Sequence, residues 1–252
     1  MVKQKKLRHH LLTLMTVFLL MNVAWFLLYI MIDHPILPSP IDVYQVIFQY
    51  DKAEMGLHIM YSLSRIFAGM ILALTLGMTI GIIMGRSKLI NRLLDPVVYL
   101  TYPIPKIALL PVVMLFFGLG EGSKILMIML ILIFQIIISV RDGVKAIPDN
   151  TYDVLSTLGA GRWQKFYHIT LPGALSVIFS TIRISLGTAI SVLFFTEIYG
   201  TEYGMGFYIM DAWLRLDYNG MYGGILLFSF LGFVLFLLID LLDYWLMKWR
   251  RY

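Results

Sequence analysis

The chain has 252 residues, of which 60% are hydrophobic, and it carries a formal net charge of +5. Its mean hydropathy of +0.82 excludes a soluble globular domain, in which the apolar share is nearer half. The absence of cysteine excludes a disulfide framework and a thiolate metal site. This composition predicts an all-α integral membrane protein with a multi-pass location in the cell membrane.

Six apolar segments predict membrane spans, because about twenty apolar residues cross the hydrocarbon core of a bilayer. They are Leu11–Ile32, Ser64–Gly85, Val97–Gly118, Ile125–Val140, Ala174–Ile198 and Met221–Trp249. The third is interrupted by prolines and the fourth is short. The first is too long for a signal-peptide core and lacks a small-x-small cleavage site, so we expect it to remain as an anchor.

Basic residues cluster in alternate polar segments, whereas the segments between them are mainly acidic. The clustered residues are Lys3, Lys5, Lys6, Arg8, Arg86, Lys88, Arg92, Arg141, Lys145, Arg162, Lys165, Lys248, Arg250 and Arg251. The positive-inside rule then places both termini and the polar loop 142–172 in the cytoplasm. The basic charge is therefore a signal of topology, and nucleic acid is not an expected partner.

Between the first and second spans, segment 39–50 predicts a short helix at the outer surface. Ser39 is a good N-cap, Pro40 fits the first helical position, and Asp42 completes a start similar to a capping box. Three apolar side chains could lay this helix on the outer membrane surface. They are Val43, Val46 and Ile47.

The second predicted span carries a small residue at every fourth position. The stripe consists of Gly69, Ala73, Gly77, Gly81 and Gly85. Such a spacing keeps the small residues near one face of a helix and allows another backbone to approach closely. Tight packing within one subunit is favoured, and sliding between helices during gating is the alternative.

The polar loop 142–172 predicts two short helices joined by a glycine turn. Asn150 is a candidate N-cap, with Asp153 at the third helical position. Gly159 and Gly161 supply permissive backbone for a sharp reversal.

A second short helix is expected from Arg162, and Pro172 should end it, because the residue before a proline avoids the helical region. Three aromatic residues would lie along one side of this helix. They are Trp163, Phe166 and Tyr167. On these residues alone, a compact docking element and an ordinary capped loop are equally supported.

The loop resembles the EAA loop of ABC-importer permeases, whose pattern is Glu-Ala-Ala, three residues, Gly, nine residues and Ile-x-Leu-Pro. Gly159, Ile169, Leu171 and Pro172 stand at the family spacing, and Asp153 stands in place of the Glu. The two alanines are replaced by Val and Leu.

Other segments are similar to the nitrate, taurine and aliphatic-sulfonate branch of that family, so that the resemblance covers the chain from Leu37 to Trp249. They are Leu37–Pro40, Ser64-Arg65, Tyr102–Pro111 and Phe117–Glu121.

The resemblance implies a type I ABC-importer permease fold, with one permease domain over residues 1–252 and a cytoplasmic coupling helix. It implies that the loop docks on a cytoplasmic ABC ATPase dimer and that a second copy of the permease pairs with the first. It also implies that an extracytoplasmic binding protein delivers a small solute such as a sulfonate, taurine or nitrate. The residues expected to couple to the ATPase are Asp153, Ser156, Leu158, Gly159, Ala160, Arg162, Leu171 and Pro172.

Charged and polar residues inside the third and fifth spans have two interpretations, since charges at this depth usually face protein or water. In the first interpretation, these residues line a pathway for an anion. In the second, Arg183 pairs with a carboxylate or carbonyl inside the protein and Lys106 reaches toward the cytoplasm. The second interpretation is favoured, and a Glu in the position of Glu197 is frequent in the resembling family and could be structural. The pathway candidates are Lys106, Arg183, Ser185, Thr188 and Glu197.

Several enzymatic motifs are missing from the sequence. Gly118–Lys124 lacks the order of a phosphate-binding Walker A loop, and neither His-Glu-x-x-His nor Gly-x-Ser-x-Gly occurs. We therefore expect a transport subunit that has no catalytic residue, metal or cofactor of its own, with ATP used by the partner. The alternative is an ATP-independent channel or secondary carrier, and an intramembrane enzyme or scaffold is disfavoured.

Overall fold

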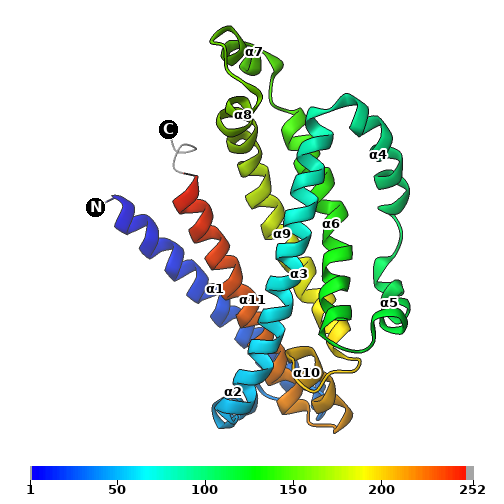
Figure 1. Cartoon of the computed structure of the whole chain (residues 1–252). Helices are drawn as coiled ribbons and strands as arrows, with labels where there is room; N and C mark the ends of the chain where they lie inside the picture. The colour runs from blue at the N-terminus through cyan, green and yellow to red at the C-terminus, as the bar shows by residue number, and fades with distance from the viewer. Residues whose placement is uncertain (1, 248–252) are drawn as a thin grey trace. The chain divides into compact units, whose positions relative to one another are not determined.

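The computed structural model describes residues 2–247, except for the side chains of residues 2–11 and 14, and all its regular elements in that range are helical (Figure 1). The α-helices are α1 (Val2–Ile32), α2 (Pro40–Gln49), α3 (Lys52–Arg86), α4 (Lys88–Thr101), α5 (Leu110–Phe117), α6 (Glu121–Lys145), α7 (Asp149–Thr157), α8 (Arg162–Lys165), α9 (Leu171–Glu197), α10 (Met205–Leu214) and α11 (Tyr218–Leu246). A 3₁₀ turn covers Lys106–Leu109, and a π-helical segment covers Phe166–Thr170. The prediction of an all-α protein is confirmed.

Five helices within the described residues are long and apolar enough to cross a membrane, and a bent pair makes a sixth candidate span. That pair is Lys88–Thr101 with Lys106–Phe117, and its two parts meet at 80°. The third span thus begins earlier than the predicted Val97, and its prolines mark the break. The fourth is longer than predicted, at 25 residues. The predicted limit of the sixth, Trp249, and the basic residues after it lie outside the described part of the chain.

The contacts divide the chain into two compact units, of which the first comprises residues 1–56 and 208–227. In this unit the ring of Trp25 stacks on that of Tyr222 at a centroid distance of 5.9 Å, and the Tyr44 hydroxyl donates to Asn22 Oδ1 at 2.7 Å. The hydroxyl of Tyr50 donates to a backbone carbonyl near the start of α11 at 3.0 Å. Aromatic side chains therefore hold this unit together.

The start of α2 has the predicted cap. Ser39 Oγ accepts the Asp42 amide at 3.1 Å and donates to the Asp42 carboxylate at 2.7 Å, and Pro40 opens the helix. The expected membrane-facing side is different, because Val43 is fully buried in the protein, whereas Phe48 is 85% exposed. Part of the face that was assigned to the membrane surface is thus buried in the protein.

The second unit comprises residues 57–207 and 228–252, and α3, α6 and α9 form its centre. The glycine stripe of α3 faces α6: a methyl group built on Gly69 would lie 2.6 Å from Ile128 Cγ2, and one on Gly77 would lie 2.8 Å from Ile136 Cγ2. These approaches are too close for any side chain. The predicted tight packing within one subunit is confirmed.

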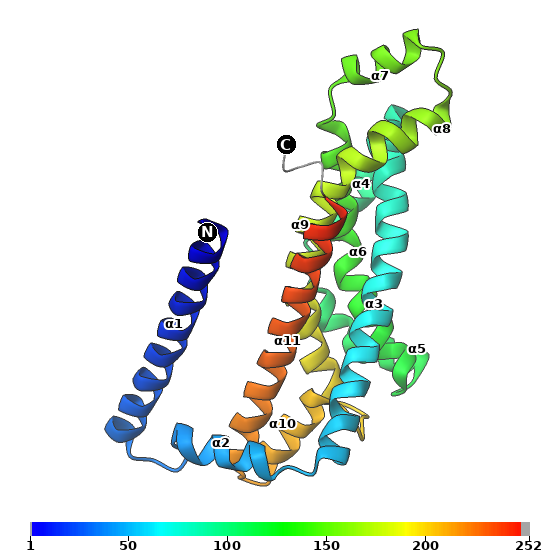
Figure 2. The same ribbon diagram turned by 90° about the vertical axis from the view of Figure 1, so that its left-hand side faces the viewer.

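The two ends of this unit carry different elements. Both views place α7 and α8 at the end where α3 joins α4, and place α5 at the opposite end (Figures 1 and 2). Helix α7 projects beyond the ends of α3 and α6, whereas α8 lies level with the end of α3 (Figure 2). The basic residues that close α3 and α6 therefore share one end with the predicted coupling loop.

Candidate functional site

Helix α7 begins two residues earlier than predicted, at Asp149 instead of Thr151. Pro148 is its N-cap residue, without a side-chain cap, and the Thr151 amide donates to the Pro148 carbonyl at 3.1 Å. The prediction of Asn150 as N-cap and Asp153 in a capping box is wrong. Proline fixes φ and preorganises the entry, so that the helix starts at Asp149 and moves both side chains past the capping positions.

The turn after α7 has the predicted reversal at Gly159, where φ is +75°. The Ala160 amide donates to the Leu155 carbonyl at 2.9 Å, and the Gly159 amide donates to the Ser156 carbonyl at 3.0 Å. This pair of bonds forms a Schellman motif, which requires a left-handed residue after the helix. Gly161 does not need its permissive backbone, because its φ is −71°.

Helix α8 continues into α9, and Pro172 does not end it. Arg162–Glu197 qualifies as one candidate span, and Pro172 lies in the first turn of α9. The π-helical segment before it shifts the register, so that the Leu171 amide donates to the Phe166 carbonyl, five residues back. An inserted π turn and a first-turn position both accommodate a residue that has no amide hydrogen. The predicted stop at Pro172 is wrong for this reason.

Tyr152 anchors α7 to the helices beneath it. Its side chain is buried, its hydroxyl lies 3.1 Å from Thr170 Oγ1, and the guanidinium carbon of Arg86 lies 3.7 Å from its ring centroid. A cation above an aromatic face is attracted by the ring quadrupole. One residue of α7 therefore contacts the last residue of α3 and the segment that leads into α9. The sequence interpretation did not include Tyr152, although an aromatic residue in the otherwise polar start of α7 was a signal.

The opposite side of the loop presents large apolar side chains to solvent. Leu158 is 76% exposed and Trp163 is 81% exposed, and the Trp163 ring meets the Phe166 ring edge-on at 5.8 Å. The eight predicted coupling residues divide by position. Five are exposed at the tip, namely Asp153, Ser156, Leu158, Gly159 and Arg162, and three are half-buried, namely Ala160, Leu171 and Pro172.

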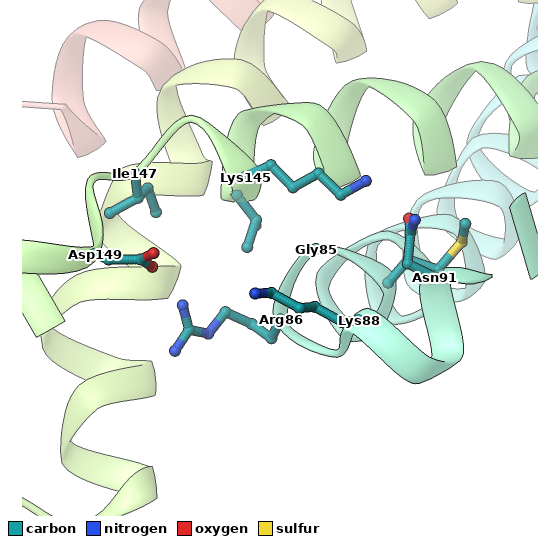
Figure 3. Close-up of a pocket in the computed structure, with 9 residues that line it drawn as sticks. Gly85, Arg86, Lys88, Asn91, Lys145, Ile147 and Asp149 are labelled. Atoms are coloured by element: carbon teal, nitrogen blue, oxygen red, sulfur yellow. The ribbon is translucent and has the colours of Figure 1, made fainter.

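A cavity of about 320 Å³ lies at the root of the loop, where α3 and α6 end and α4 begins. Arg86, Lys88 and Lys145 line it together with Asn91, and Asp149 lies beside the Arg86 side chain (Figure 3). Three cations and one carboxylate thus share this cavity.

The pathway candidates on α9 have separate surroundings. The Arg183 guanidinium donates through Nε to Asp240 Oδ1 at 2.8 Å, and its Nη2 lies 3.8 Å from Asp243 Oδ2. The part of the favoured interpretation that pairs Arg183 with a carboxylate is confirmed, whereas the role of Arg183 in a pathway stays a prediction. Ser185 is fully buried, whereas the Thr188 hydroxyl is half-exposed and donates to a carbonyl of its own helix.

Lys106 is held near the bend between α4 and α5. Its ammonium donates to the carbonyls of Thr101 and Tyr102 at 3.1 and 2.9 Å and lies 4.8 Å from the centroid of Phe134. These carbonyls lie at the end of α4, where helical partners run out, and the Thr101 carbonyl also accepts the Ile104 amide at 3.3 Å. The side chain therefore closes a helix terminus in this structure.

Glu197 belongs to a buried ionic cluster on the opposite end of the unit. Arg65 Nη1 donates to Glu197 Oε1 at 2.6 Å, Ser62 Oγ donates to the same carboxylate at 2.8 Å, and the Gly206 amide donates to it at 2.8 Å. Arg65 also binds both carboxylate oxygens of Glu121 at 2.6 Å. The cluster ties α3, α6 and α9 together. Sequence spacing could not reveal it, since Arg65 and Glu197 stand 132 positions apart.

Comparison with known proteins agrees with this architecture. Residues 77–252 match the family described as "Binding-protein-dependent transport system inner membrane component". The chain is 31% identical over 242 residues to the taurine transport system permease protein TauC of Escherichia coli (strain K12), covering 93% of this chain and 88% of that protein. It is 32% identical over 217 residues to the putative aliphatic sulfonates transport permease protein SsuC of Bacillus subtilis (strain 168), covering 86% and 79%.

The fold also matches solved transporters. A bacterial ABC transporter involved in the import of the acidic polysaccharide alginate has a chain that superimposes with a TM-score of 0.67 at 19% identity, covering 93% of this chain and 96% of that one. This likeness supports the fold alone. The family match over residues 77–252 and the 31% identity to TauC over 93% of the chain identify it as a member of the binding-protein-dependent transport system inner membrane component family, the permease components of ABC importers.

Proposed function

We propose that this permease forms the translocation pathway of an ATP-driven importer as a homodimer, with a cytoplasmic ABC ATPase dimer and an extracytoplasmic solute-binding protein as partners. The family description itself refers to binding-protein-dependent transport. A solved bacterial alginate ABC transporter, similar in fold, is in complex with an alginate pentasaccharide-bound periplasmic protein. The ATPase would hydrolyse ATP, and this chain would carry the solute.

The observation that carries the proposal is the two-sided construction of the α7–α8 loop. Tyr152 is buried against Arg86 and Thr170, while Leu158 and Trp163 are largely exposed. Exposed apolar side chains that cluster outside a membrane mark a contact surface for another protein. A partner bound to the exposed side chains could displace α3 and α9 through the contacts of Tyr152 with Arg86 and Thr170.

The basic end of the unit would lie in the cytoplasm. Arg86, Lys88 and Lys145 gather beside the loop (Figure 3), as the positive-inside rule requires of cytoplasmic segments. This orientation would put the ATPase on the side of the membrane where ATP is available.

A charge-insertion variant tests the docking surface. Leu158→Glu should abolish co-purification of the ATPase subunit, because it places a carboxylate in an apolar contact. Asn150→Glu is the matched control, since it adds the same charge to an exposed position at the start of α7. Co-purification of the ATPase with Leu158→Glu at the wild-type ratio would contradict the proposal.

A second variant separates docking from coupling. Tyr152→Ala removes the buried anchor but leaves the exposed side chains in place, so the ATPase should still bind while solute-stimulated hydrolysis and transport fall together. Tyr167→Ala removes a tyrosine that is 65% exposed, and it serves as the control. Solute uptake by the permease alone, without ATPase, would instead favour a channel or secondary carrier.

The proposed solute is a small sulfonate, nitrate or a similar oxyanion, since relatives are named for the transport of taurine, aliphatic sulfonates and nitrate. Uptake of taurine, an alkanesulfonate and nitrate should be measured in vesicles that hold the complete complex. A binding protein that prefers a cation or a peptide would overturn this choice.

The roles of the pathway candidates can be tested in the same vesicles. If the Arg183 field attracts the anion, Arg183→Gln should slow uptake, and Asp240→Asn should speed it by removing the opposing charge. Equal loss of complex assembly in both variants would assign the pair a purely structural role.

A further inference from the structure

A second cavity lies at the same end of the unit, between the end of α3 and the start of α8. Its volume is about 560 Å³. Three cations line it, Arg86, Arg162 and Lys165, and its apolar lining comes from Ile82, Ile83 and Phe166. Of the described residues, none that lines it is acidic. The cavity is therefore amphipathic, with one strongly positive part and one apolar part.

The position of the cavity coincides with a membrane boundary. One candidate span ends at Arg86 and another begins at Arg162. Ile83 lies in the last turn of the first of these and is 42% exposed. Since basic residues at the end of an apolar span favour the headgroup region, we expect the cations to lie near the headgroups and the apolar side chains to lie on the hydrocarbon side of them.

None of the three cations forms a close ion pair within the described chain, since the ion pairs present there involve other basic residues; Asp149 lies beside Arg86, but on the side of the neighbouring cavity. Arg86 is nevertheless held in place, because its guanidinium carbon lies 3.7 Å from the centroid of the Tyr152 ring. A planar guanidinium matches the oxygens of a phosphate and needs less ordering when it is already stacked. The neighbouring cavity differs, because Asp149 already lines it.

We propose that this cavity binds the phosphate headgroup of an anionic phospholipid from the adjoining leaflet. The phosphate would bind Arg86, Arg162 and Lys165, and the first part of an acyl chain would lie against Ile82, Ile83 and Phe166. Basic pockets between spans at headgroup depth are suited to anionic lipid. A soluble anion would leave the apolar part unused, and an ATPase surface would not reach into the hydrocarbon. The bound lipid would lie at the junction through which α7 contacts α3.

The test uses the purified full-length chain in detergent, with retained lipid measured by native mass spectrometry. Phosphatidylglycerol should bind more tightly than phosphatidylcholine of the same chain length. Lys165→Gln should weaken phosphatidylglycerol binding about fivefold, the effect expected of one basic residue near a charged bilayer surface. Lys88→Gln is the matched control, because it removes the same charge from the neighbouring cavity, and it should change binding less than about twofold.

Three results would overturn the proposal. Equal weakening by Lys165→Gln and Lys88→Gln would indicate unspecific attraction to the basic surface. Displacement of phosphatidylglycerol by inorganic phosphate alone would indicate a soluble anion site, and displacement by the ATPase subunit would assign the cations to the protein interface. Arg162→Gln provides a second variant with the same expected loss, should Lys165→Gln fail to fold.

Discussion

Substitution of Gly159 tests the backbone geometry of the predicted coupling loop separately from its side-chain contacts. At φ +75°, a residue with a Cβ costs about 1–2 kcal/mol more than glycine. A Cβ at this position would meet no atom within 4 Å, so backbone strain accounts for the whole expected effect. Gly159→Ala should therefore shift the local opening of the turn by a factor of roughly 5–30.

The assay is hydrogen exchange of the Ala160 amide, which donates to the Leu155 carbonyl across the turn. Its exchange should speed up by that factor in Gly159→Ala and by less in Gly159→Asn, because asparagine tolerates the left-handed region better. Gly161→Ala is the control, since Gly161 has an ordinary φ of −71° and a new Cβ there would lie 3.8 Å from its nearest neighbour.

The functional readout is transport and solute-stimulated ATPase activity in reconstituted vesicles, beside a pull-down of the ATPase subunit. Gly159→Ala should lower coupled activity, and Gly159→Val should lower it further, because a β-branched residue is a more severe outlier at positive φ. Equal exchange rates in Gly159→Ala and Gly161→Ala would refute the strain argument. Wild-type activity of Gly159→Val in all three assays would show that the turn is not the coupling element.

Three further predictions concern a buried ion pair, the packing of α3 on α6, and the membrane topology. Arg65→Ala should destabilise the fold by about 3–5 kcal/mol, because it leaves the fully buried partner Glu197 unpaired; thermal unfolding in detergent measures this, and a wild-type midpoint would contradict it. Gly77→Leu should lower the yield of folded protein, since its Cβ would lie 2.8 Å from Ile136, and a normal yield would mean that α3 and α6 can separate freely. A cysteine at Glu202 should react with an impermeant thiol reagent added outside intact cells, whereas one at Lys165 should not; the opposite labelling would reverse the proposed topology.

Hydropathy was sufficient to predict the spans, but it could not predict the bend of the third. Apolar length is a property of local sequence, and it located all five long helices to within about one to three turns at each end. The bend between α4 and α5 depends on which of several prolines interrupts the helix. It also depends on what binds the carbonyls at the end of α4, and Lys106 is one such donor, because its ammonium contacts the carbonyls four and five residues back.

The candidate site could be predicted only where the signal was local. The reversal at Gly159 follows from glycine's access to positive φ, and the sequence was sufficient for it. The capping prediction at Asn150 failed because Pro148 already fixes the start of the helix. The partners of Tyr152 and Arg65 were beyond prediction, since they are set by how separate helices pack, and a single sequence carries no record of that packing.

The buried ionic cluster has a mechanical meaning for the whole unit. Arg65 and Arg86 are 21 residues apart on the uninterrupted helix α3, which corresponds to about 32 Å along its axis at 1.5 Å per residue. At one end, Arg86 meets the loop through Tyr152; at the other, Arg65 is fastened to Glu121 on α6 and Glu197 on α9. Because α3 is uninterrupted, a tilt of about 5° would displace one of these two contacts relative to the other by about 3 Å across that length. A small displacement of α7 at Tyr152 would therefore be carried through α3 to the buried cluster that joins α6 and α9.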